Sequence, residues 1–269
     1  MAKQDEVEYA WRMSAEHAAN KPFSDGDCGR NLIRLGTLFT LLPPPPARLL
    51  DLGCGTGWTS RFFARAGYAV VGVDIAPEMI RLATEGRDAD RAANLSFAVS
   101  DYENLAYRDE FDCAVFFDSL HHADDERLAV RRAFEALKPG GVCLADEPGE
   151  GHSRSEDSLA AVAKYGVTEK DMPPAHVVAL GREAGFAAFR VFPHAHELER
   201  AVYTDRAAPV ADPFAHVDPR WEAGRTAGRW TKLARRLRFA LSPYPAWRLT
   251  NVDHLLLQVR ANGLVLMRK

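Results

Sequence analysis

The chain has 269 residues, of which 47% are hydrophobic and 26% are charged, and its formal net charge is −3. These proportions are those of an ordinary globular protein, and they exclude a collagen, a coiled coil and a largely disordered chain. A slightly acidic chain gives no reason to expect nucleic acid as a partner.

The first residues and the cysteines bear on the compartment. The chain begins with charged residues and no apolar core, which predicts no secretory leader, and no stretch of about 20 apolar residues follows that would span a membrane. The four cysteines are widely spaced, without a pair at metal-ligand spacing. We therefore expect a cytoplasmic protein without a metal.

In chain order, residues 1–46 are predicted to form an N-terminal helical lid, with amphipathic stretches at 9–19 and 31–42, which ends at the four prolines 43–46. Short apolar runs then alternate with helical patterns, which indicates βαβ units and a parallel sheet. The predicted strands are 48–52, 69–74, 95–100, 112–117, 141–145, 188–192 and 264–267, and the predicted helices are 58–66, 77–83, 125–137 and 175–184. This pattern predicts a core at 47–194, an insertion at 195–262 and a final core strand at 263–269.

A glycine-rich loop follows the first predicted strand. Gly53, Gly55 and Gly57 alternate just before a helix, where glycine allows positive φ and lets a ligand lie against bare backbone. A dinucleotide fingerprint needs a glycine at position 58, and this chain has Trp58. The loop also follows Asp51, a carboxylate that repels a pyrophosphate and attracts an ammonium group. We therefore expect the loop to bind a zwitterion.

Acidic residues also end the second and third predicted strands. Asp74 stands where a carboxylate can accept both ribose hydroxyls, and Asp101 stands where one can meet an adenine amino group. Because the carboxyl ends of parallel strands share one edge of a sheet, these acids and the glycine loop are expected to form one ligand site.

These residues, together with the strand end at 117–122 and the segment Leu137-Lys138-Pro139-Gly140-Gly141, resemble the ordered motifs of the class I S-adenosylmethionine-dependent methyltransferases. The resemblance covers residues 47–192 and implies an α/β, Rossmann-like fold. Its sheet has seven mostly parallel strands, the last antiparallel, with helices on both faces. The implied cofactor is S-adenosyl-L-methionine, with S-adenosyl-L-homocysteine as product. The residues implied in its binding are Asp51, Gly53, Cys54, Gly55, Gly57, Asp74, Ile75, Met79, Asp101, Tyr102 and Asp118.

Methyl transfer to an alcohol requires that the acceptor lose a proton, so a base near the donor is expected to help. His121 and His122 follow the fourth strand, and Glu147 follows the fifth; these are the predicted catalytic residues. The histidines also fit a reading in which they only cap the next helix or close the site. His152 and Tyr165 are the predicted substrate-binding residues.

The predicted insertion carries a charge that the overall balance hides. Seven basic residues and one acid lie between Arg220 and Arg238, and an apolar stripe at helical spacing runs through 230–241. The segment 229–241 fits a packed helix with a solvated basic face. It also fits weak contact with an anionic membrane surface, a site for an anionic acceptor, or a homodimer contact.

The sequence thus predicts a methyltransferase that acts on the oxygen of a small molecule, sugar or glycosylated metabolite, in polysaccharide or natural-product biosynthesis. Two alternatives remain open. One is transfer to nitrogen or carbon of a natural product, and the other is a non-catalytic partner subunit with the same fold. The intact glycine loop and Asp74 argue against the partner subunit.

Overall fold

The structure, a computed structural model, describes residues 3–4, 7–8, 20–194, 259 and 261–269. The chain divides into two compact units, Met1–His194 with Val259–Lys269, and Ala195–Gln258. All of the described residues belong to the first unit. The predicted helical stretch 9–19 and the basic segment 229–241 lie outside the described residues, so the roles expected for them stay predictions.

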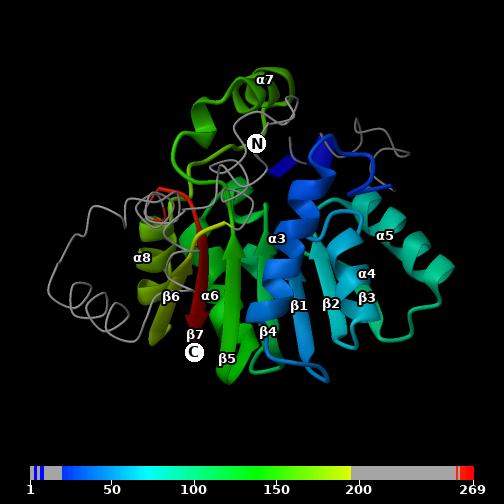
Figure 1. Cartoon of the computed structure of the whole chain (residues 1–269). Coiled ribbons are helices and arrows are strands. Elements are labelled where there is room, and N and C mark those ends of the chain that lie inside the picture. The colour runs from blue at the N-terminus through cyan, green and yellow to red at the C-terminus, as the bar shows by residue number, and fades with distance from the viewer. Residues whose placement is uncertain (1–2, 5–6, 9–19, 195–258, 260) are drawn as a thin grey trace, which may run out of the picture. The chain divides into compact units, whose positions relative to one another are not determined.

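A seven-stranded sheet in the order β3-β2-β1-β4-β5-β7-β6 forms the centre of the first unit (Figure 1). Its strands are β1 (Arg48–Leu52), β2 (Ala69–Asp74), β3 (Leu95–Val99), β4 (Phe111–Phe117), β5 (Leu137–Asp146), β6 (Ala188–Phe192) and β7 (Leu264–Arg268). Neighbouring strands from β3 to β5 pair in parallel, and β7 pairs antiparallel with both β5 and β6. The predicted Rossmann-like fold with an antiparallel last strand is confirmed.

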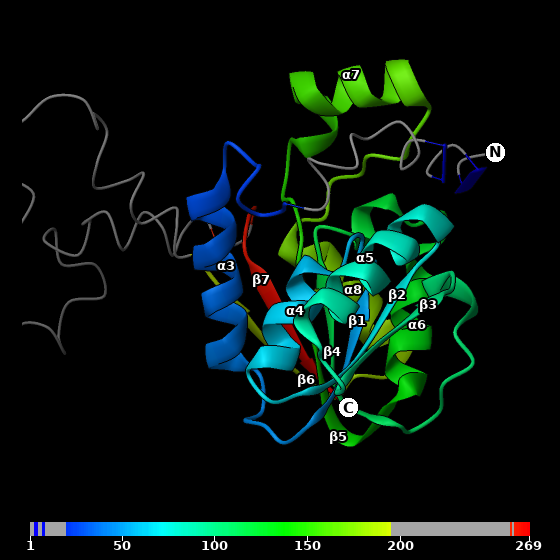
Figure 2. The same ribbon diagram turned by 90° about the vertical axis from the view of Figure 1, so that its right-hand side faces the viewer.

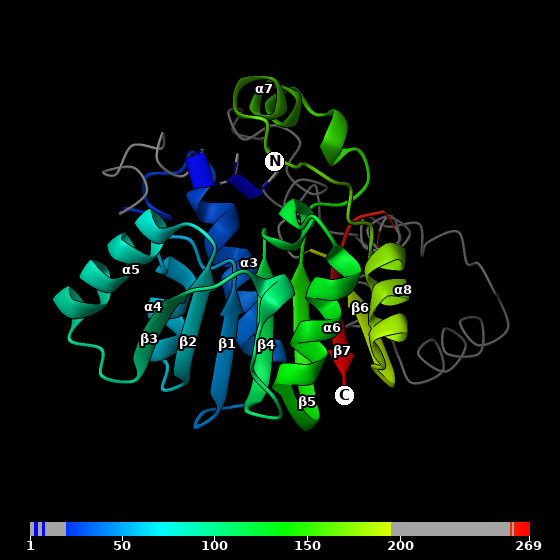
Figure 3. The same cartoon turned by 180° about the vertical axis from the view of Figure 1, so that it is seen from behind.

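Helices connect the strands and cover both faces of the sheet. They are α3 (Cys28–Leu41), α4 (Trp58–Arg65), α5 (Pro77–Asp90), α6 (Glu126–Ala136), α7 (Glu156–Tyr165) and α8 (Pro174–Ala184), with short 3-10 helices η1 (Tyr102–Asn104), η2 (Leu120–His122) and η3 (His152–Arg154). Viewed along the sheet, α3 and α4 lie on one side and α6 lies on the other (Figure 2). Viewed from behind, α6 and α8 cover the strands (Figure 3).

Each face of the sheet has its own apolar core. Leu35 and Leu38 of α3 and Phe63 of α4 pack with Leu49 and Val115 on one face. On the other face, apolar residues of α6 and α8 pack against side chains that alternate with these along the same strands, such as Leu50 and Ala114. Burial on both faces explains why the strands read as continuous apolar runs rather than as an alternating pattern.

Three elements differ from their predicted form, the first being α5, which runs to Asp90 rather than ending at residue 83. The fifth strand begins at Leu137, because Leu137 already pairs with Phe111 before a register shift leads to the pair Cys113–Val142. The helix α7 was not predicted, although Ser155 caps its first turn and Gly166 ends it in a left-handed conformation. Its apolar residues Leu159 and Val162 are exposed, so α7 lacks the buried stripe by which helices are recognised.

The strand ends that carry the predicted site residues lie at one edge of the sheet, and α7 lies beyond this edge (Figure 1). Among the described residues, no helix is both long enough and apolar enough to cross a membrane.

Candidate functional site

The glycine loop after β1 has the backbone that its sequence predicts. Gly53, Gly55 and Gly57 all have positive φ, between 51° and 72°. A side chain on Gly53 would collide with Ser119, since an ideal Cβ lies 2.5 Å from the Ser119 Cβ; one on Gly57 would meet Phe97 at 2.4 Å. No heavy atom lies within 4 Å of the Cβ position of Gly55. Gly53 and Gly57, the two ends of the loop, are therefore packed against other residues, whereas the space beside Gly55 in the middle is open.

Asp51 is buried beneath this loop. Its Oδ2 accepts hydrogen bonds from the hydroxyls of Thr59 and Ser60 in the first turn of α4, at 2.7 and 2.5 Å. Burial raises the pKa of Asp51 to about 6, although these two hydrogen bonds lower it. Cys54 is also buried, and burial raises the pKa of its thiol. Asp51 thus ties the glycine loop to the helix that follows it.

Asp74 at the end of β2 faces the glycine loop. Its Oδ2 accepts a hydrogen bond from the Gly55 amide at 2.8 Å, and its Oδ1 accepts one from the Ala76 amide at 2.9 Å. Of the two following residues predicted to bind the cofactor, Met79 is buried beside Ala76 and Ile75 is partly buried. The structure therefore brings the first two predicted strand-end groups into direct contact.

Asp101 follows β3 and begins η1. Its carboxylate accepts hydrogen bonds from the Glu103 amide, from the Asn104 side chain and from Lys3 near the N-terminus. The hydroxyl of the neighbouring Tyr102 donates a hydrogen bond to the Ser119 carbonyl oxygen at 3.0 Å. Because Ser119 also lies under Gly53, Tyr102 is joined to the glycine loop through a single residue.

Asp118 is exposed at the end of β4, and it belongs to an ion-pair network that centres on the buried Arg34 of α3. Both guanidinium NH groups contact the Asp118 carboxylate, at 2.5 and 2.7 Å, and Arg34 also pairs with Asp146 at 2.9 Å. Desolvation of its carboxylate would raise the pKa of Asp118, but the Arg34 charge holds this pKa below its usual range. Asp118 has φ of +47°, and its amide donates to the Asp146 carbonyl. The network fixes the end of β4 against α3 and β5.

His121 and Glu147 form a buried pair at the ends of β4 and β5. Glu147 Oε1 accepts the amides of Ser119 and Leu120, at 3.0 and 2.9 Å. Its Oε2 accepts the His121 amide at 3.3 Å and lies 2.8 Å from the ring Nδ1 of the same residue. Four contacts match the acceptor sites of one carboxylate. Glu147 thereby holds both the backbone of η2 and the imidazole of His121.

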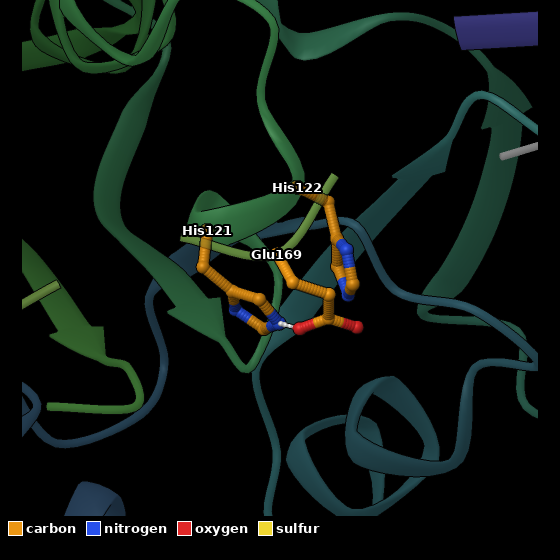
Figure 4. Close-up of side chains that lie close together, drawn as sticks. All are labelled: His121, His122 and Glu169. Carbon is orange, nitrogen blue, oxygen red and sulfur yellow. Dashed lines mark ion pairs between the residues drawn. The ribbon is translucent and has the colours of Figure 1, made fainter. Parts of the chain in front are cut away.

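Three imidazoles surround the carboxylate of Glu169. His152 Nε2 lies 2.6 Å and His121 Nε2 lies 3.7 Å from Glu169 Oε2. The His121 and His122 rings are 3.9 Å apart, and Figure 4 shows Glu169 beside both of them. Burial would raise the pKa of Glu169, but the His152 hydrogen bond and the neighbouring imidazoles lower it. We call His121, His122, His152 and Glu169 the histidine cluster.

Backbone contacts hold the loops that carry this cluster. The amides of Gly151 and Ser153 donate to the Asp171 carboxylate at 2.9 and 2.7 Å, and the Met172 amide donates to the Pro148 carbonyl. These three hydrogen bonds join the two loops that bring His152 and Glu169 together. Tyr165 lies at the end of α7, where the Lys164 ammonium lies 4.8 Å from the centre of its ring.

Most of the predicted site residues thus fall into two neighbouring groups, one at the glycine loop and one at the histidine cluster, which Ser119 joins. Asp118 instead pairs with Arg34, and Tyr165 lies at the end of α7. Sequence reasoning did not identify Arg34 or Glu169. Arg34 lies in a helix outside the recognised motifs, and Glu169 stands among other charged residues in a loop. In this part of the chain, only His152 and Tyr165 were predicted to belong to the site.

Comparison with known proteins identifies the central part of the chain. Residues 50–145 match the family model described as "Methyltransferase domain". A ubiquinone biosynthesis O-methyltransferase of Xanthomonas axonopodis pv. citri (strain 306) is 34% identical over 113 residues, which cover 41% of this chain and 47% of that protein. The chain therefore spans about half the length of the curated relatives that it matches.

Solved structures share the fold. Phosphoethanolamine N-methyltransferase 2 of Haemonchus contortus, solved with S-adenosyl-L-methionine, has a TM-score of 0.56 and 20% identity, over 88% of this chain and 51% of that one. The [4+2]-cyclase SpnF has a TM-score of 0.53 and 18% identity, over 90% and 81%. Residues 50–145 therefore form a methyltransferase domain, and the sheet order together with these structures shows that the first unit has the fold of the S-adenosylmethionine-dependent methyltransferases.

Proposed function

We propose that this protein transfers the methyl group of S-adenosylmethionine to a hydroxyl oxygen of a small molecule, sugar or glycosylated metabolite. The observation that carries the proposal is the contact between the glycine loop and Asp74. Three glycines with positive φ lie at the end of β1, and the carboxylate at the end of β2 is hydrogen-bonded to the middle one. Open α/β sheets bind nucleosides at this edge.

The residues at this edge fit the cofactor. The open space above Gly55 allows a ligand to approach the backbone, while the collisions that a side chain on Gly53 or Gly57 would make explain why both ends of the loop are glycine. By family resemblance, the loop would hold the methionine part, Asp74 the ribose, and Asp101 with Tyr102 the adenine. The Asp74 oxygens that accept the two amides also carry the charge to which ribose hydroxyls donate.

When bound, S-adenosylmethionine supplies a methyl group that an acceptor oxygen attacks in line, so that the carbon–sulfur bond breaks and its electron pair stays on sulfur. The donor is already activated, and the protein must align the acceptor and remove its proton. His121 of the histidine cluster is two residues along the chain from Ser119, and a side chain on Gly53 of the glycine loop would collide with Ser119. We assign to the histidine cluster the binding of the hydroxyl and the removal of its proton.

An oxygen acceptor agrees with the name of the matched relative, an O-methyltransferase. It also agrees with the chemistry of the cluster, since three imidazoles and a carboxylate offer hydrogen bonds and basic groups to a polar acceptor. We assign Glu147 a positioning role rather than the predicted role of base, because its acceptor sites are already used by amides and by His121.

The cofactor site is tested by Asp74→Ala. Loss of charged hydrogen bonds to ribose should weaken S-adenosylhomocysteine binding by about 1–3 kcal/mol, measured by isothermal titration calorimetry. Asp90→Ala is the matched control, because this carboxylate pairs with Arg61 and Arg65 at the surface and should not affect binding. Equal affinity of the Asp74 variant and the unaltered protein would refute the assignment.

The reaction is tested with S-adenosylmethionine labelled in the methyl group and a panel of hydroxylated acceptors, including free and nucleotide-linked sugars. Formation of a labelled methyl ether is the expected result. Tight cofactor binding with label found only on nitrogen or carbon acceptors would overturn the oxygen assignment. Binding without transfer to any acceptor would favour a role other than methylation, such as that of the cyclase that shares this fold.

A further inference from the structure

The histidine cluster brings nitrogen and oxygen ligand atoms together at one point. One ligand atom from each of His121, His122 and Glu169 lies within 4.8 Å of the other two (Figure 4). Ligands held about 2.1 Å from an ion in tetrahedral geometry lie about 3.4 Å apart, close to the 3.7 Å between His121 Nε2 and Glu169 Oε2. The other pairs of ligand atoms lie within 4.8 Å of each other, so they need to converge by at most about 1.4 Å.

The imidazoles of His121 and His122 each have a hydrogen-bond partner at Nδ1, the ring nitrogen that is not the proposed ligand atom. His121 Nδ1 lies 2.8 Å from Glu147 Oε2, and His122 Nδ1 lies 2.7 Å from the Thr168 carbonyl oxygen. A carbonyl and an ionised carboxylate can only accept, so each Nδ1 carries the hydrogen. In a neutral ring the lone pair is then on Nε2. Carboxylate or carbonyl acceptors on the far nitrogen are the usual partners of histidines that ligate metals.

The carboxylate is held in a similar way. His152 contacts Glu169 Oε2 at 2.6 Å, and the hydrogen bonds from Gly151 and Ser153 to Asp171 fix the loop that carries His152. Within the described residues, His121 is buried while His122 and Glu169 are partly exposed. The group is thus rigidly positioned on its inner side and accessible on its outer side.

We propose that His121, His122 and Glu169 bind a divalent first-row transition metal through the two Nε2 atoms and the carboxylate, with His152 supporting Glu169. Two imidazoles and one carboxylate favour ions such as Zn²⁺, Fe²⁺, Co²⁺ or Mn²⁺ over Mg²⁺ and Ca²⁺, which prefer oxygen ligands. Three protein ligands leave coordination positions open for a second molecule. This proposal departs from the sequence-based expectation of a metal-free site.

The role of the ion rests on the proposed function. With an ion bound, the Nε2 lone pairs of His121 and His122 would be used in coordination, so the ion would take over the activation that the imidazoles provide without it. A divalent cation there would bind the acceptor hydroxyl and lower its pKa, and the released proton would pass to water. The binding of the ion itself does not depend on that reaction. Metal affinity and methyl transfer can therefore be measured separately.

The test is metal binding to the full chain after treatment with a chelator and dialysis. Titration with Zn²⁺ by calorimetry, and with Co²⁺ by visible absorption, should give one equivalent per chain. His122→Ala and Glu169→Gln should each weaken this binding by about 10-fold to 100-fold. His176→Ala is the control, because His176 lies near Glu126 on α8 and α6, outside the cluster, and should leave binding unchanged.

Retention of S-adenosylhomocysteine binding by both variants establishes that they are folded. If either variant fails to fold, His152→Ala and an S-adenosylhomocysteine-bound sample of the unaltered protein are titrated in its place. Absence of a one-to-one complex in the unaltered protein, or equal affinity in the cluster variants, would overturn the metal site. Metal binding without cofactor binding would instead refute the proposed function and support the metal site.

Discussion

At the scale of single residues, Asp51 shows how the site combines a charge with burial. Only 1% of its surface is exposed, and two hydroxyls of α4 are its hydrogen-bond donors. Burial raises its pKa from 3.8 to about 6. Between these two values the folded chain holds a proton that the unfolded chain releases, so this group lowers the stability of the fold as the pH rises.

We therefore expect Asp51→Asn to stabilise the cofactor-free protein at pH 7 by up to about 3 kcal/mol, since each pKa unit corresponds to about 1.4 kcal/mol. The amide oxygen of Asn can still accept a hydrogen bond from a hydroxyl of α4. The gain should be absent near pH 4, grow to about pH 6 and then level off, as measured by urea unfolding.

Asp90→Asn is the control for this experiment. The Arg61 hydrogen bond lowers the pKa of Asp90, so its removal should destabilise the protein at pH 7 and matter less below pH 4. The free energy of unfolding of Asp51→Asn is compared with that of the unaltered protein at each pH. If the difference between them is the same at pH 4 and pH 7, the raised pKa of Asp51 is contradicted.

At the scale of elements, two helices contain a glycine in opposite surroundings. Gly36 lies on the exposed side of α3, and no heavy atom lies within 4 Å of its Cβ position. Gly181 lies on the buried side of α8, where a Cβ would approach Met267 Sδ at 2.5 Å and Phe189 Cε1 at 2.8 Å. Glycine is a poor helix former at both positions, but only at Gly181 does close packing require it.

Gly36→Ala should stabilise the protein by about 0.5–1 kcal/mol, because alanine loses less backbone entropy on entering a helix. Gly181→Ala should destabilise it by about 1–3 kcal/mol, because α8 must move away from β6 and β7. Thermal and urea unfolding of the two variants provide the measurement. Changes of the same sign would show that α8 does not pack on the sheet as described.

At the scale of the whole molecule, the sheet is built from both ends of the first unit. β6 and β7 are neighbours although residues 195–258 separate them in the chain, and Phe192 pairs with Leu264. The Glu150 amide donates to the Ala261 carbonyl, so the segment before β7 also contacts the loop that carries His152. Antiparallel neighbours can be joined by a short connection.

Replacement of residues 195–258 by a short glycine–serine linker should therefore preserve the sheet and the cofactor site. We expect S-adenosylhomocysteine affinity to stay within about a factor of two of the original, as for substitutions far from a site, and turnover of the acceptor to fall. Calorimetry and the labelled-methyl assay measure the two quantities. Loss of cofactor binding would mean that the segment contributes to the donor site, and full turnover would exclude it from acceptor recognition.

Most of the sheet and the cofactor edge can be predicted from the amino-acid sequence alone. Buried strands and positive-φ glycines depend on local patterns, and acids that follow parallel strands reach the same edge whatever the loop lengths are. The start of the fifth strand at Leu137 was less readable, because its first pair forms before a register shift.

The contacts between side chains that are distant in the chain can be seen only in the folded structure. Glu147 and Glu169 lie 26 and 48 residues beyond His121, and the loops that carry them are aligned by hydrogen bonds between backbone and Asp171. Arg34 reaches Asp118 and Asp146 from a helix that carries no motif. Such contacts depend on how strands and loops pack across the edge, and the spacing of residues along the chain does not encode that packing. The histidine cluster is therefore a product of the fold, whereas the glycine loop can be read from the sequence.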